Sequence, residues 1–287
     1  MRRTMATEAQ NAPTRLVYQY DEGIREHSTS IRSSQLFSAL PPEEQSLYKE
    51  GDDKTYALEL EETIFYVQGG GQQCDTGSIA GNGSEEQNFR VHSVRYGAEG
   101  RTLHFGHFTS PKASFDKGQP VVLRIDGARR LLNSRIHTAG HIVSLALRRV
   151  AAKNADLDVT EWKASHYPSA AFVDFKGLID GKHKDAVQEE ATALVAASLP
   201  ITIAWYAPEE LKENNVIMPE GMQLVSSREN GKVRVVDIVG AGPGGSSGAY
   251  PCGGTHVEDS SKVGKVIIKK ISRSKGNSKI SYEVGDQ

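Results

Sequence analysis

The spacing of apolar residues changes near Asp126, and this change limits the folds open to the chain. Before Asp126, short stretches alternate apolar with polar residues or combine aromatic and β-branched residues, as strands do. The strand candidates are TYALELEETIFYV (55–67), FRVHSVRYG (89–97), RTLHFGHFT (101–109) and QPVVLRID (119–126). Short strands at regular spacing, with turn residues between them, predict a small barrel or sandwich.

After Asp126 the apolar residues follow a helical period. Leu131, Ile136, Ile142 and Leu145 predict a long helix within residues 127–153. Further candidates are a helix at 182–198, a short helix at 208–214, strands at 170–177, 199–207 and 232–240, and a hairpin at 265–284 that turns near Lys275-Gly276-Asn277. The sequence therefore predicts an α+β protein with two domains. They are an N-terminal β-barrel-like domain, residues 1–125, which is expected to carry the glycine-rich segment QGGGQQCDTGSI (68–79), and a C-terminal mixed α/β core with a largely antiparallel sheet, residues 126–287.

Composition narrows the class of protein further. The chain has 38% hydrophobic and 24% charged residues, which is typical of a globular protein, and a net charge of −2. No apolar run approaches the roughly 20 residues that cross a bilayer, so we expect no membrane partner. Two cysteines, Cys74 and Cys252, favour a reducing compartment over a disulfide framework. The N-terminus MRRTMATEAQ lacks the apolar core of a secretory signal. We expect a cytoplasmic monomer, with a short mitochondrial presequence as the alternative.

A glycine-rich loop follows the strand candidate at 232–240. Gly240, Gly242 and Gly245 formally match the G-x-G-x-x-G pattern of dinucleotide-binding proteins. That pattern requires a helix that begins at the loop, because the helix N-terminus holds the pyrophosphate. The residues that follow, SSGAYPCGG, are too rich in glycine and proline for a helix. The sequence therefore predicts an ordinary turning loop here.

Two short motifs combine residues that bind metals. His137 and His141 stand four residues apart, so they share one face of the predicted helix. Cys252 and His256 form a C-x-x-x-H motif whose two glycines allow a tight turn. Three imidazoles and one thiolate suit tetrahedral zinc. Thr138 stands where zinc proteases of the H-E-x-x-H type carry their glutamate, so that class is disfavoured.

Two other interpretations of these residues remain open. Cys252 could be a nucleophile with a histidine as its base, but that role leaves the pair His137 and His141 unexplained. The four residues could also be an ordinary buried cysteine and three unrelated histidines, which requires more coincidence.

These motifs carry a resemblance to a known family. RIHTAGHIVSLAL and CGGTHVEDSSKVGKVIIKKI resemble the editing domain of alanyl-tRNA synthetases and its free-standing relatives, the AlaX proteins. ETIFYVQGGGQQCDTGSI and KASHYPSAAFVDFKG add matches upstream, so the resemblance covers roughly 56–284. It implies that His137, His141, Cys252 and His256 bind one zinc ion in an editing core. It also implies hydrolysis of mischarged alanine tRNA, with release of serine or glycine. Because no segment is long enough for an aminoacylation domain, we expect a trans-acting deacylase.

The resemblance also implies roles for residues outside the zinc motifs. Thr63 matches a family threonine proposed to distinguish serine from alanine, and a catalytic role is expected for Gln72 as well. The glycines that precede Gln72 are expected to line the cleft for the acceptor end or, as the alternative, to turn a corner of the barrel; they are Gly69, Gly70 and Gly71. His166 is expected to assist proton transfer or to touch the substrate, and Lys163 to bind it. Val67 and Gln73 replace prolines of the family, which puts the stiffness of the loop in doubt.

A tRNA partner requires a basic surface. Residues 262–279 contain seven lysines and arginines and no acidic residue. We expect Lys269, Lys270 and Arg273 from this hairpin to contact phosphates, which would contribute little sequence reading. The second choice is an arginine group around the start of the predicted long helix: Arg124, Arg129, Arg130 and Arg135. A zinc-stabilised RNA-binding module of the same fold without hydrolytic activity is the alternative function.

Overall fold

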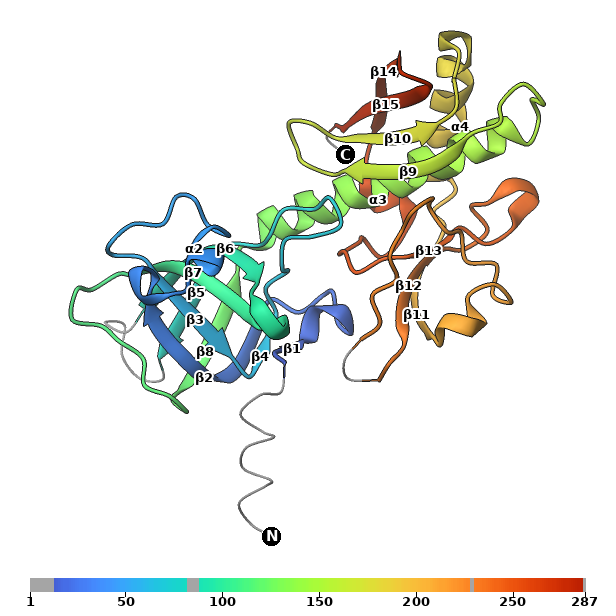
Figure 1. Cartoon of the computed structure of the whole chain (residues 1–287). Helices are drawn as coiled ribbons and strands as arrows, with labels where there is room; N and C mark the ends of the chain where they lie inside the picture. Colours follow the sequence, from blue (N-terminus) through green and yellow to red (C-terminus); the bar gives the residue numbers. More distant parts are fainter. Residues whose placement is uncertain (1–12, 82–87, 228–229, 286–287) are drawn as a thin grey trace. The chain divides into compact units, whose positions relative to one another are not determined.

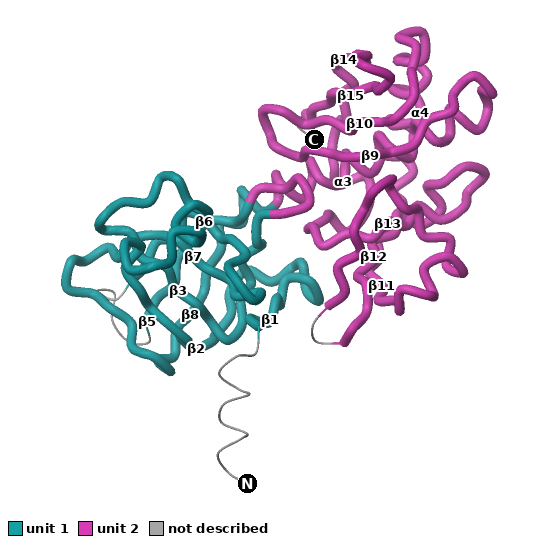
Figure 2. The backbone as a smooth tube through the Cα atoms, in the orientation of Figure 1, with its two compact units in different colours: residues 1–68, 74–130 teal, residues 69–73, 131–287 magenta. Residues whose placement is uncertain are grey.

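The computed structural model describes residues 13–81, 88–227 and 230–285. The chain divides into two compact units (Figure 2). The first contains residues 1–68 and 74–130, and the second contains residues 69–73 and 131–287. The division thus falls within the long helix, after Arg130, and assigns the short glycine-rich segment to the second unit. Among the described residues, no helix is both long enough and apolar enough to span a membrane.

The first unit is built around a closed barrel of six antiparallel strands in the order β2-β3-β7-β6-β5-β8 (Figure 1). The strands are β2 (Glu26–Leu36), β3 (Tyr56–Leu60), β5 (Gly77–Gly81), β6 (Asn88–Tyr96), β7 (Thr102–Phe108) and β8 (Pro120–Ile125). A parallel pair, β1 (Arg15–Leu16) with β4 (Glu62–Thr63), and the short helix α2 (Pro42–Gln45) complete this unit. The predicted barrel is confirmed.

Period-two patterning explains why the barrel strands form. In β8, Val121, Leu123 and Ile125 are buried, and the residues between them are partly or fully exposed. The first barrel strand, β2, is missing from the predicted elements because its sequence EHSTSIRSSQL is mostly polar. Ile31 is its one fully buried hydrophobic residue. Although β2 has no continuous apolar face, hydrogen bonds to β3 on one side and to β8 on the other hold it in the barrel.

The second unit contains two antiparallel sheets and two helices. The four-stranded sheet has the order β14-β15-β10-β9, and the three-stranded sheet has the order β11-β12-β13. The elements are α3 (Gly127–Ala151), β9 (Thr160–Ser165), β10 (Phe172–Lys176), α4 (Lys184–Ala196), β11 (Ile201–Tyr206), β12 (Val233–Ile238), β13 (Ala249–Pro251), β14 (Val266–Ser274) and β15 (Asn277–Val284). The mixed α+β character with antiparallel sheets is confirmed.

One apolar cluster joins the helices and sheets of the second unit. It contains Ile142 and Val143 of α3, Leu194 of α4, Phe175 of the four-stranded sheet and Ile238 of the three-stranded sheet. Figure 1 shows α3 running along the four-stranded sheet. Burial of these side chains stabilises α3 against both sheets. The residues of α3 that face the cluster recur with the helical period, so the apolar residues of its sequence do too.

Three predicted details have clear outcomes. The hairpin of β14 and β15 turns at Lys275 and Gly276, whose φ angles of 50° and 81° suit a two-residue turn. The predicted short helix at 208–214 is reduced to a 3-10 turn, Pro208–Glu210. The loop after β12 leads into another 3-10 turn, Pro243–Gly245, and then into β13, so no α-helix begins there.

Candidate metal centre

Four side chains of types that bind metals converge in the second unit. His137 and His141 stand one turn apart on α3, and Cys252 and His256 lie in the segment after β13. One ligand atom from each residue lies within 4.8 Å of the others. The structure therefore brings together all four residues that the two motifs predict as ligands.

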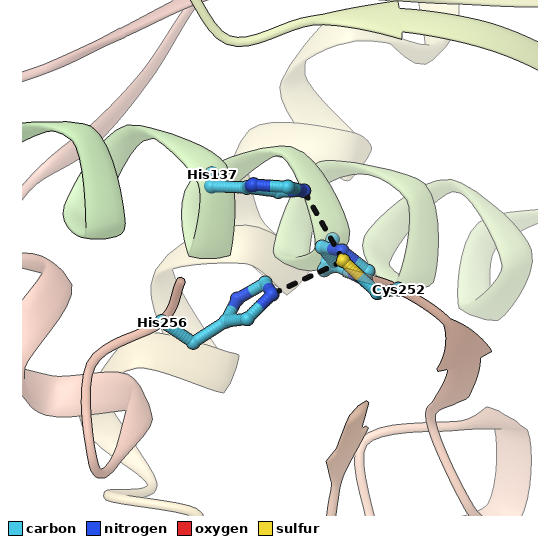
Figure 3. A group of neighbouring side chains, drawn as sticks. His137, Cys252 and His256 are labelled. Atoms are coloured by element: carbon cyan, nitrogen blue, oxygen red, sulfur yellow. Dashed lines mark hydrogen bonds between the residues drawn. The ribbon is translucent and has the colours of Figure 1, made fainter. Parts of the chain in front are cut away.

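The spacing of the donor atoms fits one metal ion. Figure 3 shows the sulfur of Cys252 facing the rings of His137 and His256. The Cys252 Sγ atom lies 3.5 Å from His137 Nε2 and 3.3 Å from His256 Nε2. A tetrahedral ion with bonds of about 2.3 Å to sulfur and about 2.0–2.1 Å to nitrogen separates such atoms by about 3.5 Å. The residues present therefore fit a bound metal.

Gln72 determines which nitrogen of His137 faces the centre. His137 Nδ1 donates to Gln72 Oε1 at 2.6 Å, and this oxygen also accepts from the backbone N–H of Thr255 at 3.1 Å. The Gln72 amide nitrogen donates to Thr255 Oγ1 at 2.9 Å, which fixes the orientation of the amide. Because Nδ1 carries the proton, Nε2 presents its lone pair toward Cys252.

Thr138 has the same relation to His256. Its Oγ1 lies 3.1 Å from His256 Nδ1 and accepts from the backbone N–H of Val257 at 3.3 Å. When Nδ1 donates to Thr138, His256 also presents Nε2 toward Cys252. Two of the three histidines are thus oriented by a polar side chain on their far nitrogen, as metal-binding histidines usually are.

The loop between Cys252 and His256 is held from two sides. Arg234, on β12, donates from Nη1 to the carbonyl oxygens of Cys252 and Gly254, at 2.7 and 3.0 Å. The Gly254 N–H donates to Cys252 Sγ at 3.4 Å, which favours the thiolate. A Cβ atom at Gly254 would lie 2.1 Å from His137 Cε1. Glycine is therefore required there for close approach of the loop to the ring.

Electrostatics keeps the histidines neutral, which is the form that binds metals. Burial and, as the second cause, the nearby guanidinium of Arg234 lower the pKa of His141 to about 4. Burial is also the first cause that holds the pKa of His137 and His256 well below the ordinary value, followed by the surrounding imidazoles. A buried cationic imidazole would be costly in this cluster.

His166 lies against this cluster. Its ring stacks on the ring of His137, with centroids 4.0 Å apart and planes 19° apart. Tyr282 Oη donates to the carbonyl oxygen of Ile136 at 3.0 Å, so His166 Nδ1 is the donor in its 2.7 Å contact with Tyr282 Oη. His166 Nε2 is therefore the acceptor nitrogen. A Cβ atom at Gly140 would lie 2.3 Å from the His166 ring. Glycine at this position of α3 therefore leaves room for the ring.

The glycine segment belongs to the second unit and carries Gln72. Gly70 and Gly71 have φ angles of 52° and 77°, and Gly69 forms a bridge with Gln72. The Gly71 carbonyl accepts from the backbone N–H of His166 at 2.8 Å. These glycines therefore place Gln72 and His166, and their predicted contact with the substrate stays a prediction.

Thr63 belongs to the first unit, where its side chain is fully buried. His104 Nδ1 donates to the carbonyl oxygen of Leu58 at 3.1 Å, so His104 Nε2 accepts from Thr63 Oγ1 at 2.8 Å. The Thr63 oxygen also accepts from the backbone N–H of Phe65 at 3.1 Å. Both hydrogen-bonding capacities of this hydroxyl are used, which favours a structural role. Its predicted selectivity for serine stays a prediction.

The predicted basic residues fall in different places. Lys163 lies on β9, at one edge of the four-stranded sheet, and forms an ion pair with Asp174 at 3.5 Å. Lys269, Lys270 and Arg273 lie on β14, at the other edge. Lys269 pairs with Glu283 at 2.8 Å and Arg273 with Asp180 at 3.5 Å.

Three of the four arginines in the second-choice group have partners inside the protein, whereas Arg124 is exposed and pairs with Glu26 at 2.7 Å. A phosphate contact of this group stays a prediction. Arg130 is fully buried and pairs with the fully buried Asp75 inside the first unit. Arg129 donates to the carbonyl oxygen of Cys74 at 3.0 Å, and Arg135 donates to that of Val263 at 2.8 Å. The charge pattern alone could not reveal these internal partners.

Four polar residues around the centre were not among the predicted site residues: Thr138, Thr255, Arg234 and Tyr282. Two signals were present. Thr138 and Thr255 stand inside the HTAGH and CGGTH motifs, and Arg234 stands among the valines of its strand. A charged residue at a buried strand position usually has a specific partner.

Fold and site together define an α+β protein with a six-stranded barrel and a centre of three histidines and one cysteine, two of them buried and two partly buried. The chain is similar to the alanyl-tRNA editing protein AlaX-L of Pyrococcus horikoshii, with 29% identity over 79% of this chain and 50% of that protein. It is also similar to alanine–tRNA ligases. The ligase of Neorickettsia sennetsu is 31% identical over 78% of this chain and 24% of the ligase, and that of Thermotoga maritima is 27% identical over 83% and 26%.

These similarities confirm the resemblance predicted from the motifs. The chain spans about half the length of AlaX-L and about a quarter of the ligases that it matches. No family model matches the chain.

Proposed function

We propose that this protein hydrolyses the ester bond of mischarged alanine tRNA, with seryl-tRNA(Ala) as the main substrate and glycyl-tRNA(Ala) as a second one. The observation that carries the proposal is the convergence of His137, His141, Cys252 and His256 on one centre. It occurs in a chain that is similar, over 79% of its length, to a protein named for alanyl-tRNA editing. In this proposal the protein acts in trans, as a monomer in the cytoplasm.

We assign the metal to zinc, because three imidazoles and a thiolate form a donor set that zinc prefers. When bound, zinc would orient the aminoacyl end of the substrate and stabilise negative charge that develops on the ester carbonyl. Gln72, expected to be catalytic, has both its amide oxygen and its amide nitrogen hydrogen-bonded, to His137 and Thr255, so we propose a positioning role for it.

We propose that His166 orients the substrate or the attacking water. The contact with Tyr282 holds the proton on Nδ1, so Nε2 can accept a hydrogen bond from water or from a substrate hydroxyl. Gly69, Gly70 and Gly71 form the segment beside His166, and we propose that they line the place of the terminal adenosine. Placement of water and ester in this way supplies the proximity on which hydrolysis depends.

One observation favours the second candidate function, a zinc-stabilised RNA-binding module without hydrolytic activity. Four protein ligands are typical of a structural zinc site, whereas catalytic sites usually keep one position for water or substrate. The centre described here offers four protein donors.

Deacylation assays separate the two functions. Release of labelled amino acid is measured from seryl-, glycyl- and alanyl-tRNA(Ala), with the zinc-loaded protein and with His141→Ala. We expect release of serine and glycine but not of alanine, and loss of at least about 100-fold in His141→Ala. His92→Ala, which alters an exposed histidine of the first unit, is the matched control and should retain activity. No release by folded, zinc-loaded protein would contradict the editing function and favour the binding module.

A further inference from the structure

One face of the four-stranded sheet points away from the apolar cluster of the second unit. Val173 and Phe175 of β10 and Ile280 of β15 pack into that cluster together with α3. Because side chains alternate along a strand, the neighbouring residues of these strands project from the opposite face. On β10 and β15 they are Phe172, Asp174, Lys176, Lys279 and Ser281. We call this surface the outer face.

An exposed tryptophan stands at the edge of the outer face. Trp162 is the extra residue of a bulge in β9, where Glu161 pairs with Phe175 and Lys163 with Asp174. Its side chain is 40% exposed, which is unusual for so large an apolar group. Lys163 Nζ and Lys176 Nζ lie 4.9 and 5.9 Å from the centre of its ring. The bulge therefore presents a flat aromatic surface with cations beside it.

Lysines exceed acidic residues on the part of the outer face next to Trp162. Lys163 and Lys279 flank Asp174, with Nζ atoms 3.5 and 3.8 Å from its carboxylate oxygens. Their side chains remain 54% and 41% exposed, whereas that of Asp174 is only 10% exposed. Lys279 Nζ also lies 3.7 Å from the centre of the Phe172 ring. The carboxylate thus holds two lysines in place, and their exposed positions carry an excess of positive charge.

We propose that the outer face binds the unpaired nucleotides at the 3′ end of the RNA substrate. In this proposal a base stacks on Trp162, and Lys163 and Lys279 contact the phosphates that flank it. This inference rests on the proposed editing function, because it assigns a surface to the substrate of that function. Base stacking on aromatic side chains, with lysines along the backbone, is the usual way in which proteins hold single-stranded nucleic acid.

The position of Trp162 and Lys163 along β9 supports this occupant. Lys163 precedes His166 by three residues, which corresponds to about 10 Å along an extended strand. His166 stacks on His137 in the metal centre. The centre lies on the α3 side of the sheet, so an RNA strand on the outer face would bring its terminal nucleotide to the centre by passing around β9, which is the edge strand. Arg273 is excluded from this surface, because it alternates with Lys270 and Ser272 and so projects from the other face of β14.

The first test measures binding without hydrolysis. The probe is a short, fluorescein-labelled single-stranded oligoribonucleotide with a free 3′ adenosine, and binding to the zinc-loaded protein is followed by fluorescence anisotropy. We expect Trp162→Ala to weaken binding about 10-fold or more, and Trp162→Phe to restore most of the loss. Equal affinity of Trp162→Ala and the unaltered protein, or no binding by either, would overturn the proposal. If the outer face binds a protein partner and not RNA, neither the unaltered protein nor Trp162→Ala should bind the oligoribonucleotide.

Salt dependence tests the two lysines separately from stacking. Each phosphate contact with single-stranded nucleic acid contributes about 0.7 to the slope of log affinity against log salt concentration. The double variant Lys163→Ala with Lys279→Ala should therefore lower the slope by about 1.4. The matched control is Lys212→Ala with Lys232→Ala, two exposed lysines of the second unit outside this sheet. An equal change of slope in both double variants would contradict a specific role for the outer face.

A minimal substrate distinguishes failure of this proposal from failure of the editing function. The seryl ester of adenosine lacks the upstream nucleotides that would reach Trp162. Trp162→Ala should hydrolyse this ester at the unaltered rate and raise KM for seryl-tRNA(Ala) about 10-fold. If the unaltered protein hydrolyses neither compound, the editing function fails, while the binding measurements still decide whether the outer face takes RNA. If Trp162→Ala slows both reactions equally, Trp162 has only a structural role.

Discussion

Buried histidines occur in both units, but their surroundings differ. In the barrel, both ring nitrogens of His104 have partners within the protein, the carbonyl oxygen of Leu58 and the hydroxyl of Thr63. In the second unit, the Nδ1 atoms of His137 and His256 contact Gln72 and Thr138, and their Nε2 atoms face the sulfur of Cys252. Burial of a histidine therefore does not by itself indicate a metal site. The feature that distinguishes the two units is the group that the second ring nitrogen faces.

The largest expected effect is on the zinc content of the protein, and it should differ between variants of the two cysteines. Cys252→Ser should reduce bound zinc from about one ion per chain to almost none, because a hydroxyl is a much weaker zinc ligand than a thiolate. The measurement is the zinc content of purified protein by inductively coupled plasma mass spectrometry. Cys74→Ser is the control, because Cys74 is a buried residue of the barrel. Full zinc content in Cys252→Ser would show that zinc is held without the Cys252 thiolate and would contradict the four-ligand centre.

A smaller effect is expected from a change that keeps all four ligands. In Gly254→Ala the new Cβ atom would collide with the His137 ring, so the ring or the loop must move. We expect zinc affinity to fall about 10-fold to 100-fold, as when the support of a ligand is removed. Competition with a chromophoric chelator measures the affinity. Gly181→Ala is the control, because a Cβ atom there meets no atom within 4 Å. Similar affinities of the two variants would contradict the close fit of loop and ring.

The smallest expected effect concerns the barrel. Burial lowers the pKa of His104 to about 4, below the value of about 6.5 for an unfolded chain. The neutral ring is therefore favoured in the folded state. Its contribution to stability is complete above the unfolded pKa and is lost as the pH falls toward 4. Between pH 7 and pH 5 the loss should be about 2 kcal/mol in the free energy of unfolding.

His104→Gln removes this titration and leaves a side chain that can still accept a hydrogen bond from Thr63. We expect the stability of this variant to fall by about 2 kcal/mol less than that of the unaltered protein between the two pH values. Urea unfolding followed by far-UV circular dichroism at pH 7 and pH 5 measures the difference. The same pH dependence in both proteins would show that His104 does not titrate in the way its burial implies.

The comparison also explains which elements could be predicted. β8 and α3 carry strong apolar periods, so their type and position follow from local sequence. β2 does not, because Ile31 is its one fully buried hydrophobic residue and closure of the barrel supplies partners on both sides. The predicted boundary between domains at residue 125 stays a prediction. The compact units divide at Arg130, because that side chain is buried with Asp75.

The sequence by itself determined the candidate ligands. Spacings of four residues, on a helix and around two glycines, bring metal-binding side chains together through local geometry. Only the tertiary structure decided what surrounds them. Gln72 lies 65 positions from His137 and 183 from Thr255, and no local pattern reports contacts over such separations. The same holds for Trp162 and Lys279, which share the outer face only because β9, β10 and β15 are neighbours in one sheet. The chemistry of each side chain follows from its residue type. Its hydrogen-bond partners and the face on which it lies depend on how distant segments pack.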